Sequence, residues 1–262
     1  MIAAPLPRPG RARPRCRHPC WPRPPDAGGP TRTTVIHIWS TQGFLDYLFN
    51  PFLLEGALTT LWLTAASLAG GLALGILLAL MRLSPHRPVS LIAATYCWLF
   101  RGTPLLVQLL IIYTGLPLFG IRFSVTQAAL LGLALNEAAY LSEIVRAGII
   151  AVNKGQKEAG SALGLSKVQV FRLVTWPQAL RIIIPPLGNS VNGLLKTTSV
   201  ASVISMEELL RRTQILIQEK FLVLELFVAA ACWYLVMTTA WDFVQRHLEA
   251  RYGRAYAQDH RR

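Results

Sequence analysis

The sequence predicts an all-α integral membrane protein with about five transmembrane helices. Hydrophobic residues make up 53% of the 262 positions and charged residues only 15%, whereas soluble domains contain about 25% charged residues. The charges are also clustered, so that residues 56–81 contain none. As a helix this stretch is about 39 Å long, which suffices to cross the hydrocarbon core of a bilayer with some tilt.

The first part of the chain differs in composition from the rest. Residues 1–33 contain seven arginines and many prolines. Such a segment cannot form a core, so residues 1–40 are predicted to be a disordered extension. It lacks the uninterrupted apolar stretch of a signal peptide. Cys16 and Cys20 flank His18, but two thiols and one imidazole are an incomplete ligand set, and no metal site is predicted.

A membrane domain is predicted over residues 41–250, beginning with an interfacial helix at residues 43–54. Five spans are expected at residues 55–82, 88–118, 124–150, 183–206 and 221–246. In the first span, Gly71 and Gly75 form a small-xxx-small pattern that favours close contact with another helix. The second span is expected to bend at Pro104, because a short polar stretch interrupts its apolar run there.

The orientation follows from lysines and arginines in short loops. The loop at 82–88, the loop at 151–181 and the chain after residue 245 all carry basic residues and fall on one side, which is predicted to be cytoplasmic. Five spans then place the N-terminus outside and the basic tail, residues 251–262, in the cytoplasm. The arginines before residue 33 contradict this rule, which favours a start codon assigned upstream of the true one.

The segment 153–177 is polar, basic and helix-forming, and it lies between two apolar spans. Gly164 is a natural helix stop, and Ser166 with Gln169 forms a capping box for a second helix. Pro177 is expected to end that helix. One apolar face is predicted, made by Val168, Phe171 and Val174. The expected structure is a hairpin of two short helices, with a flat surface at Ala159 and Gly160.

Three interpretations of this hairpin compete. It could pack on the membrane domain as ordinary structure, it could be a helix-turn-helix that binds DNA, or it could dock a cytoplasmic motor. DNA binding is disfavoured, because a hairpin attached to the bilayer at both ends reaches a groove poorly. The residues alone leave the other two interpretations open.

At this segment the sequence resembles the permease subunits of bacterial ABC importers. Glu158-Ala159-Gly160, then Gly164, then Val174-Thr175-Trp176-Pro177 have the spacing of the Glu-Ala-Ala loop of those proteins, with Gly160 in place of Ala. The stretches 101–108, 136–146, 185–189 and 195–199 look like the branch of the family that imports polar amino acids. The resemblance covers about residues 50–250.

The resemblance implies a type I ABC importer permease in the inner membrane. It implies a second permease subunit, identical or related, two cytoplasmic ABC ATPase subunits, and an extracytoplasmic amino-acid-binding protein. No nucleic acid partner and no cofactor are expected, and lipid surrounds the spans. The coupling loop to the ATPases would contain Glu158, Ala159, Gly160, Gly164, Val174 and Pro177.

The chain is not expected to hydrolyse ATP itself. Gly188 and Gly193 have the spacing of a phosphate-binding loop, but Leu194 stands where a lysine must contact the phosphates. The predicted function is therefore a permease subunit driven by a separate ATPase, and not an enzyme. The alternative is a secondary transporter or channel with an incidental cytoplasmic hairpin.

Ionisable groups at bilayer depth are costly and suggest functional sites. A polar passage for a zwitterion is therefore predicted, lined by Asn136, Glu137, Asn192, Lys196 and Ser199. The alternative is that Glu137 and Lys196 neutralise each other inside the bundle. Glu143 and Arg146, three positions apart, are expected to form a structural ion pair.

Overall fold

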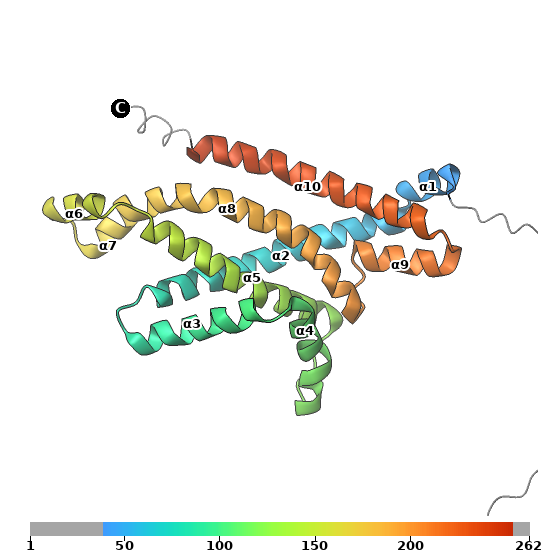
Figure 1. The fold of residues 1–262 in the computed structure, drawn as a ribbon, viewed down its shortest axis with the longest axis horizontal. Coiled ribbons are helices and arrows are strands. Elements are labelled where there is room, and N and C mark those ends of the chain that lie inside the picture. Colours follow the sequence, from blue (N-terminus) through green and yellow to red (C-terminus); the bar gives the residue numbers. More distant parts are fainter. Residues whose placement is uncertain (1–38, 254–262) are drawn as a thin grey trace, which may run out of the picture. The chain divides into compact units, whose positions relative to one another are not determined.

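The computed structural model describes residues 39–253, and every regular element in this range is a helix (Figure 1). The predictions for the arginine-rich extension before residue 39, for Cys16, His18 and Cys20, and for the tail after residue 253 lie outside the described residues. The helices are α1 Thr41–Leu48, α2 Pro51–Arg82, α3 Arg87–Gly102, α4 Leu105–Leu110, α5 Val125–Ile150, α6 Lys154–Ala162, α7 Lys167–Gln169, α8 Trp176–Thr197, α9 Leu209–Lys220 and α10 Val223–Gly253.

Three of these helices, α2, α5 and α10, are long and apolar enough to cross a membrane, or four spans exist if the bent pair of α3 and the 105–119 segment counts as one. The all-α membrane class is therefore confirmed. The five predicted spans are these four and α8, which is not among the helices that are apolar enough to cross a membrane. This helix has 22 residues, but it includes Arg181, Asn189, Asn192 and Lys196, which lower its mean hydropathy.

The pair of α2 and α5 forms the centre of the domain (Figure 1). A Cβ atom added at Gly75 would lie 3.0 Å from the Cβ of Leu141, and one at Gly71 would lie 3.1 Å from the Cβ of Glu137. The predicted small-xxx-small face is thus confirmed as a contact surface, and its partner is α5. On one side of the pair α3 contacts both helices, while on the other α8 packs on α5 and α10 packs on α8.

The bend predicted at Pro104 is present and sharp, because α3 and the following segment meet at 103°. Pro104 has no N–H, so the carbonyl of Phe100 loses its helical donor. The side-chain amide of Gln108 replaces that donor at 2.8 Å and also bonds the carbonyl of Thr103 at 3.1 Å. A single straight span over 88–118 is thereby excluded, and residues 111–115 and 116–119 continue as a π-helix and a 3-10 helix.

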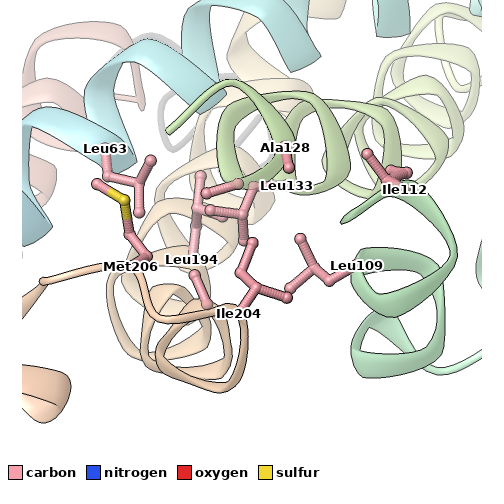
Figure 2. Packing of buried hydrophobic residues seen from close by; sticks show 10 residues of the cluster. Leu63, Leu109, Ile112, Ala128, Leu133, Leu194, Ile204 and Met206 are labelled. Carbon is pink, nitrogen blue, oxygen red and sulfur yellow. The ribbon is translucent and has the colours of Figure 1, made fainter. Parts of the chain in front are cut away.

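The main hydrophobic cluster joins α2, α4, α5, α8 and the 3-10 helix at Thr198–Ile204. Figure 2 shows Leu109, Leu133 and Ile204 pointing toward one another in this cluster. All three side chains are almost completely buried. Burial of one such side chain contributes about 1.5–3 kcal/mol. The cluster therefore holds the bent segment after Pro104 against the central pair.

The other boundaries differ from the predictions at α8 and α10. Helix α8 begins at Trp176 rather than near residue 183, and it ends at Thr197, after which a 3-10 helix leads to Ser205 in the left-handed conformation. Helix α10 extends to Gly253, beyond the predicted end at 246. The interfacial helix predicted at 43–54 is divided at Asn50, whose side chain caps the start of α2.

Candidate functional site

The hairpin predicted at 153–177 is present. Helix α6 ends before Gly164, whose φ of +79° is accessible mainly to glycine. The N–H of Leu165 then donates to the carbonyl of Gly160 at 3.3 Å, which is the closing bond of a Schellman motif. Ser166 and Gln169 form both bonds of a capping box at the start of α7. The predicted stop and capping box are therefore confirmed.

The two faces of the hairpin differ from the prediction. Glu158 and Ala159 are exposed, but Gly160 is buried, and a Cβ atom there would lie 3.3 Å from Cγ2 of Val170. Gly160 therefore helps to close the hairpin on itself instead of widening a surface. Val168 is 74% exposed, so it does not share a buried face with the half-buried Phe171 and Val174.

The expectation that Pro177 ends the second helix is wrong. Residues 170–175 form a π-helix, and α8 follows directly with Pro177 in its first turn. The N–H of Trp176 donates to the carbonyl of Phe171, five residues back. A π-turn widens the helix and accommodates a proline that would otherwise clash with the carbonyl four residues earlier. The second half of the hairpin, from Lys167 onward, and α8 are consequently one continuous helical element.

The hairpin is also connected to α5. Val152, between α5 and α6, is buried together with Ile149 and Ile183. The ammonium group of Lys157 donates to the carbonyl of Ile149 at 3.3 Å. The two halves of the hairpin are therefore held by the helices that they join, α5 on one side and α8 on the other.

A cavity of about 570 Å³ lies between the end of α3, α5 and α8. Asn136 and Glu137 both line it, together with Ser190 and Thr197. Glu137 is only 7% exposed, and its carboxylate accepts a hydrogen bond from the hydroxyl of Ser190. The amide of Asn136 bonds the carbonyl of Phe100 at 3.2 Å and Oε1 of Gln108 at 3.0 Å.

The other three predicted path residues lie elsewhere. Lys196 and Ser199 border a separate cavity of about 420 Å³ near α9 and α10. Asn192 donates to Oδ1 of Asp242 on α10 at 2.9 Å. No ion pair joins Glu137 to Lys196 in the described part of the chain, so the alternative, in which these two charges neutralise each other, is wrong within this subunit.

Sequence reasoning missed Ser190, which lines this cavity, and Gln108, which lies behind it and bonds Asn136. Ser190, the donor to Glu137, was indistinguishable from other small residues of α8, and Gln108 showed its importance only through the position of Pro104. Within residues 39–253 no three His, Cys, Asp or Glu side chains are grouped as metal ligands would be. Gly188 and Gly193 lie inside the continuous helix α8, so they form no phosphate-binding loop.

Residues 71–254 match the model of the family described as the binding-protein-dependent transport system inner membrane component. The match covers the cavity, the hairpin and α10. The chain belongs to this family. The prediction of an importer permease, rather than a secondary transporter or channel, is thereby confirmed, and the protein is a transport component and not an enzyme.

The alignments with relatives of this permease cover most of its length. The glutamine transport system permease protein of Escherichia coli K12 is 39% identical over 203 residues, which are 77% of this chain and 93% of the relative. A probable amino-acid ABC transporter permease of Bacillus subtilis is 37% identical over 215 residues, 79% of this chain and 95% of the relative. The arginine transport system permease of Corynebacterium glutamicum is 38% identical over 228 residues, which are 82% of this chain and 72% of the relative.

Solved structures agree with this membership. A chain in a crystal structure of an amino acid ABC transporter with histidines has a TM-score of 0.76 and 37% identity, with 81% of this chain and 99% of that chain covered. A chain of the inward-facing MetNI methionine transporter has a TM-score of 0.64 at 18% identity, with 77% and 96% covered, and it supports the fold alone. The type I importer fold is therefore confirmed.

Proposed function

We propose that this permease passes a polar amino acid into the cytoplasm through the cavity beside Glu137, and that separate ATPases drive it through the hairpin. One observation carries the proposal. The hairpin continues into α8 without a break, and Ser190 on α8 holds Glu137. A displacement of the hairpin by a bound ATPase therefore moves one wall of the cavity against the other.

The hairpin supplies the ATPase contact. Glu158 and Ala159 are exposed at its surface, while Gly160, Gly164 and Val174 give it its shape and Pro177 joins it to α8. Two ATPase subunits, one for each permease subunit, bind these surfaces. In this proposal the hairpin and the end of α10 lie in the cytoplasm, and residue 41 lies on the extracytoplasmic side, where a binding protein delivers the amino acid.

The passage within this subunit is formed by Asn136, Glu137 and Ser190. A zwitterion carries an ammonium group, which the buried carboxylate of Glu137 attracts at bilayer depth. Lys196 and Ser199 border the other cavity and Asn192 bonds α10, so these three do not belong to this passage. L-Glutamine is the first substrate to test, because the Escherichia coli relative is a glutamine permease.

The coupling proposal is tested in proteoliposomes containing the permease, its ATPase and its binding protein. Glu158→Lys is expected to lower ATP-driven glutamine uptake at least tenfold, because it reverses a charge at the ATPase contact. Glu219→Lys is the matched control, since Glu219 is equally a surface glutamate but lies near the end of α9. Unchanged uptake by Glu158→Lys would contradict the coupling proposal.

The passage is tested with two charge-removing variants in the same assay. Glu137→Gln keeps the size of the side chain but removes the charge, and uptake is expected to fall at least tenfold. Lys196→Met removes a charge that borders the separate cavity, and uptake is expected to remain within about twofold. Normal uptake by Glu137→Gln removes this residue from the passage.

A further inference from the structure

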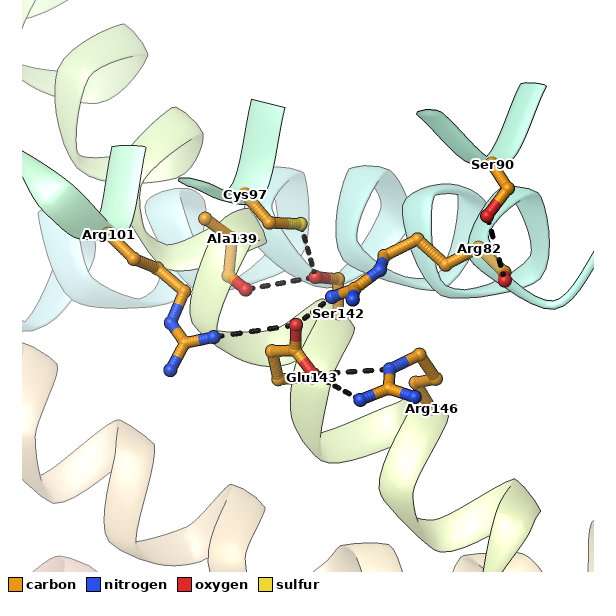
Figure 3. Close-up of polar contacts among 8 residues, drawn as sticks. All are labelled: Arg82, Ser90, Cys97, Arg101, Ala139, Ser142, Glu143 and Arg146. Carbon is orange, nitrogen blue, oxygen red and sulfur yellow. Dashed lines mark hydrogen bonds and ion pairs between the residues drawn. The ribbon is translucent and has the colours of Figure 1, made fainter. Parts of the chain in front are cut away.

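Glu143 on α5 is surrounded by three arginines from three helices (Figure 3). Arg146, on the same helix, holds Oε2 at 3.0 Å through Nη2 and at 3.2 Å through Nε. Arg82 at the end of α2 and Arg101 at the end of α3 both contact Oε1, the latter at 3.4 Å. The ion pair of Glu143 and Arg146 predicted from the sequence is confirmed, but it is one part of a larger cluster.

This cluster carries excess positive charge. Three guanidinium groups face one carboxylate, which leaves a net charge of +2. Each guanidinium has five N–H donors, and Arg82 and Arg101 each contact Glu143 through one nitrogen, Nη1. Their side chains are 21% and 45% exposed. The unused donors are therefore accessible to a further acceptor.

The donors of Arg82 and Arg101 open into a cavity of about 360 Å³, which α3 lines with Ala94, Cys97 and Trp98. This cavity and the one beside Glu137 share Arg101 and Gly102. A carboxylate binder, Arg101, thus lies between a site with a buried acid and a site with excess positive charge. Charges at bilayer depth are stable when they face water or protein partners, which indicates a polar route along this side of α5.

We propose that Arg101 and Arg82 form a carboxylate-binding site that receives the amino acid after it leaves the cavity beside Glu137. The inference rests on the proposed function. The α-carboxylate of the substrate replaces Glu143 as partner of Arg101, the more weakly held guanidinium, which also lies 5.6 Å from the ring centroid of Tyr140. A guanidinium binds a carboxylate with two parallel hydrogen bonds, which gives the site its selectivity.

The test compares two ligands that differ only at the carboxylate. The permease–ATPase complex in nanodiscs, without binding protein, is equilibrated with L-glutamine or with its α-carboxamide, which keeps the ammonium group and the side chain. The wild-type complex is expected to bind glutamine at least about tenfold more tightly, as the loss of a charge-assisted hydrogen bond predicts. Equal binding of the two ligands, or no glutamine binding at millimolar concentration, overturns the proposal of a carboxylate-binding site.

Variants separate binding from structural support. Arg101→Gln is expected to weaken glutamine binding about tenfold and to leave the carboxamide unchanged, while Arg101→Lys keeps most of the preference. Arg146→Gln is the matched control: it removes an arginine from the same carboxylate, but Arg146 lines neither cavity. Retained preference for glutamine in Arg101→Gln overturns the proposal.

For Glu143→Gln the expected change in glutamine binding has the opposite sign. The substitution removes the internal competitor of the substrate carboxylate, so glutamine binding is expected to tighten several-fold, whereas a purely structural cluster would weaken all binding. Weaker binding of both ligands in Glu143→Gln contradicts the proposal. The proposed function fails separately, if the wild-type complex shows no ATP-driven uptake with its binding protein present.

Discussion

The side-chain amide of Asn136 donates to the main-chain carbonyl of Phe100, 3.2 Å away. Pro104 leaves this carbonyl without a helical donor, and Gln108 bonds it as well. A residue that the sequence suggested as part of a passage thus also closes the break between α3 and α4. The same amide lies at the edge of the cavity beside Glu137, so the break and the cavity share one polar network.

Asn136→Ala is expected to destabilise the protein. The substitution leaves the amide oxygen of Gln108 without its donor and removes one of two bonds to Phe100. A half-buried hydrogen bond lost in this way costs about 1–3 kcal/mol. Thermal unfolding of the detergent-solubilised permease measures the effect. Asn189→Ala is the control, because Asn189 is exposed and its side-chain bond to Gln245 is 3.4 Å long. Equal unfolding temperatures for the two variants contradict the prediction.

Gly75→Ala tests the contact between α2 and α5. The new Cβ would lie 3.0 Å from the Cβ of Leu141 and 3.1 Å from the carbonyl oxygen of Ala138, so the helices must separate. A loss of about 1–3 kcal/mol is expected from overpacking. Gly70→Ala meets only the Cβ of Ala134 at 3.4 Å, an ordinary contact, and should be neutral or slightly stabilising. Chemical denaturation in mixed micelles compares the two, and an equally stable Gly75→Ala would refute the close-contact interpretation.

Gly164→Ala tests the turn of the hairpin. Among the described residues, no atom beyond the glycine and its two chain neighbours lies within 4 Å of the added Cβ, so the cost comes from the φ of +79°. Left-handed backbone costs a residue with a Cβ about 1–2 kcal/mol. Amide hydrogen exchange is expected to accelerate across α6 and α7 while the spans stay protected. Gly155→Ala in the same hairpin, where φ is not positive, serves as control, and unchanged exchange in Gly164→Ala would argue against a strained turn.

The burial of Glu208 predicts that the stability of the protein depends on pH. Glu208 lies before α9, outside the spanning helices, is fully buried, and accepts bonds from the N–H groups of Leu210 and Arg211 and from the hydroxyl of Tyr234. Burial raises the pKa of the Glu208 carboxyl above its ordinary value, although these bonds oppose the shift. A raised native pKa means that the native state binds the proton more tightly than the unfolded state.

The sign follows from this difference. The contribution of Glu208 to the free energy of unfolding is complete below the ordinary glutamate pKa. It is lost as the pH rises through the raised native pKa. The unfolding temperature of the wild-type protein is therefore expected to fall relative to that of Glu208→Gln between acidic and neutral pH. Scanning fluorimetry of both proteins across this range measures the difference. A constant difference shows instead that the pKa of Glu208 is the same in the folded and the unfolded protein.

Local patterns predicted the hairpin well and its faces poorly. Gly164 and the pair of Ser166 and Gln169 act within a few residues, so their effect was readable from the chain. The role of Pro177 was mispredicted, because proline usually ends a helix, but here a π-turn over residues 170–175 absorbs it. The burial of Gly160 depends on contact with Val170, and no periodicity signals that contact.

The sequence by itself determined the class of protein, the order of its helices, the bend at Pro104 and the hairpin, because apolar length, proline and capping residues act locally. Only the tertiary structure decided which polar groups meet. The packing of α2, α3, α5 and α8 places Ser190 on Glu137 and gathers three arginines around Glu143, while it keeps Lys196 away from both. The partner of a buried charge is set by how helices distant in sequence pack, and that information lies in no single segment.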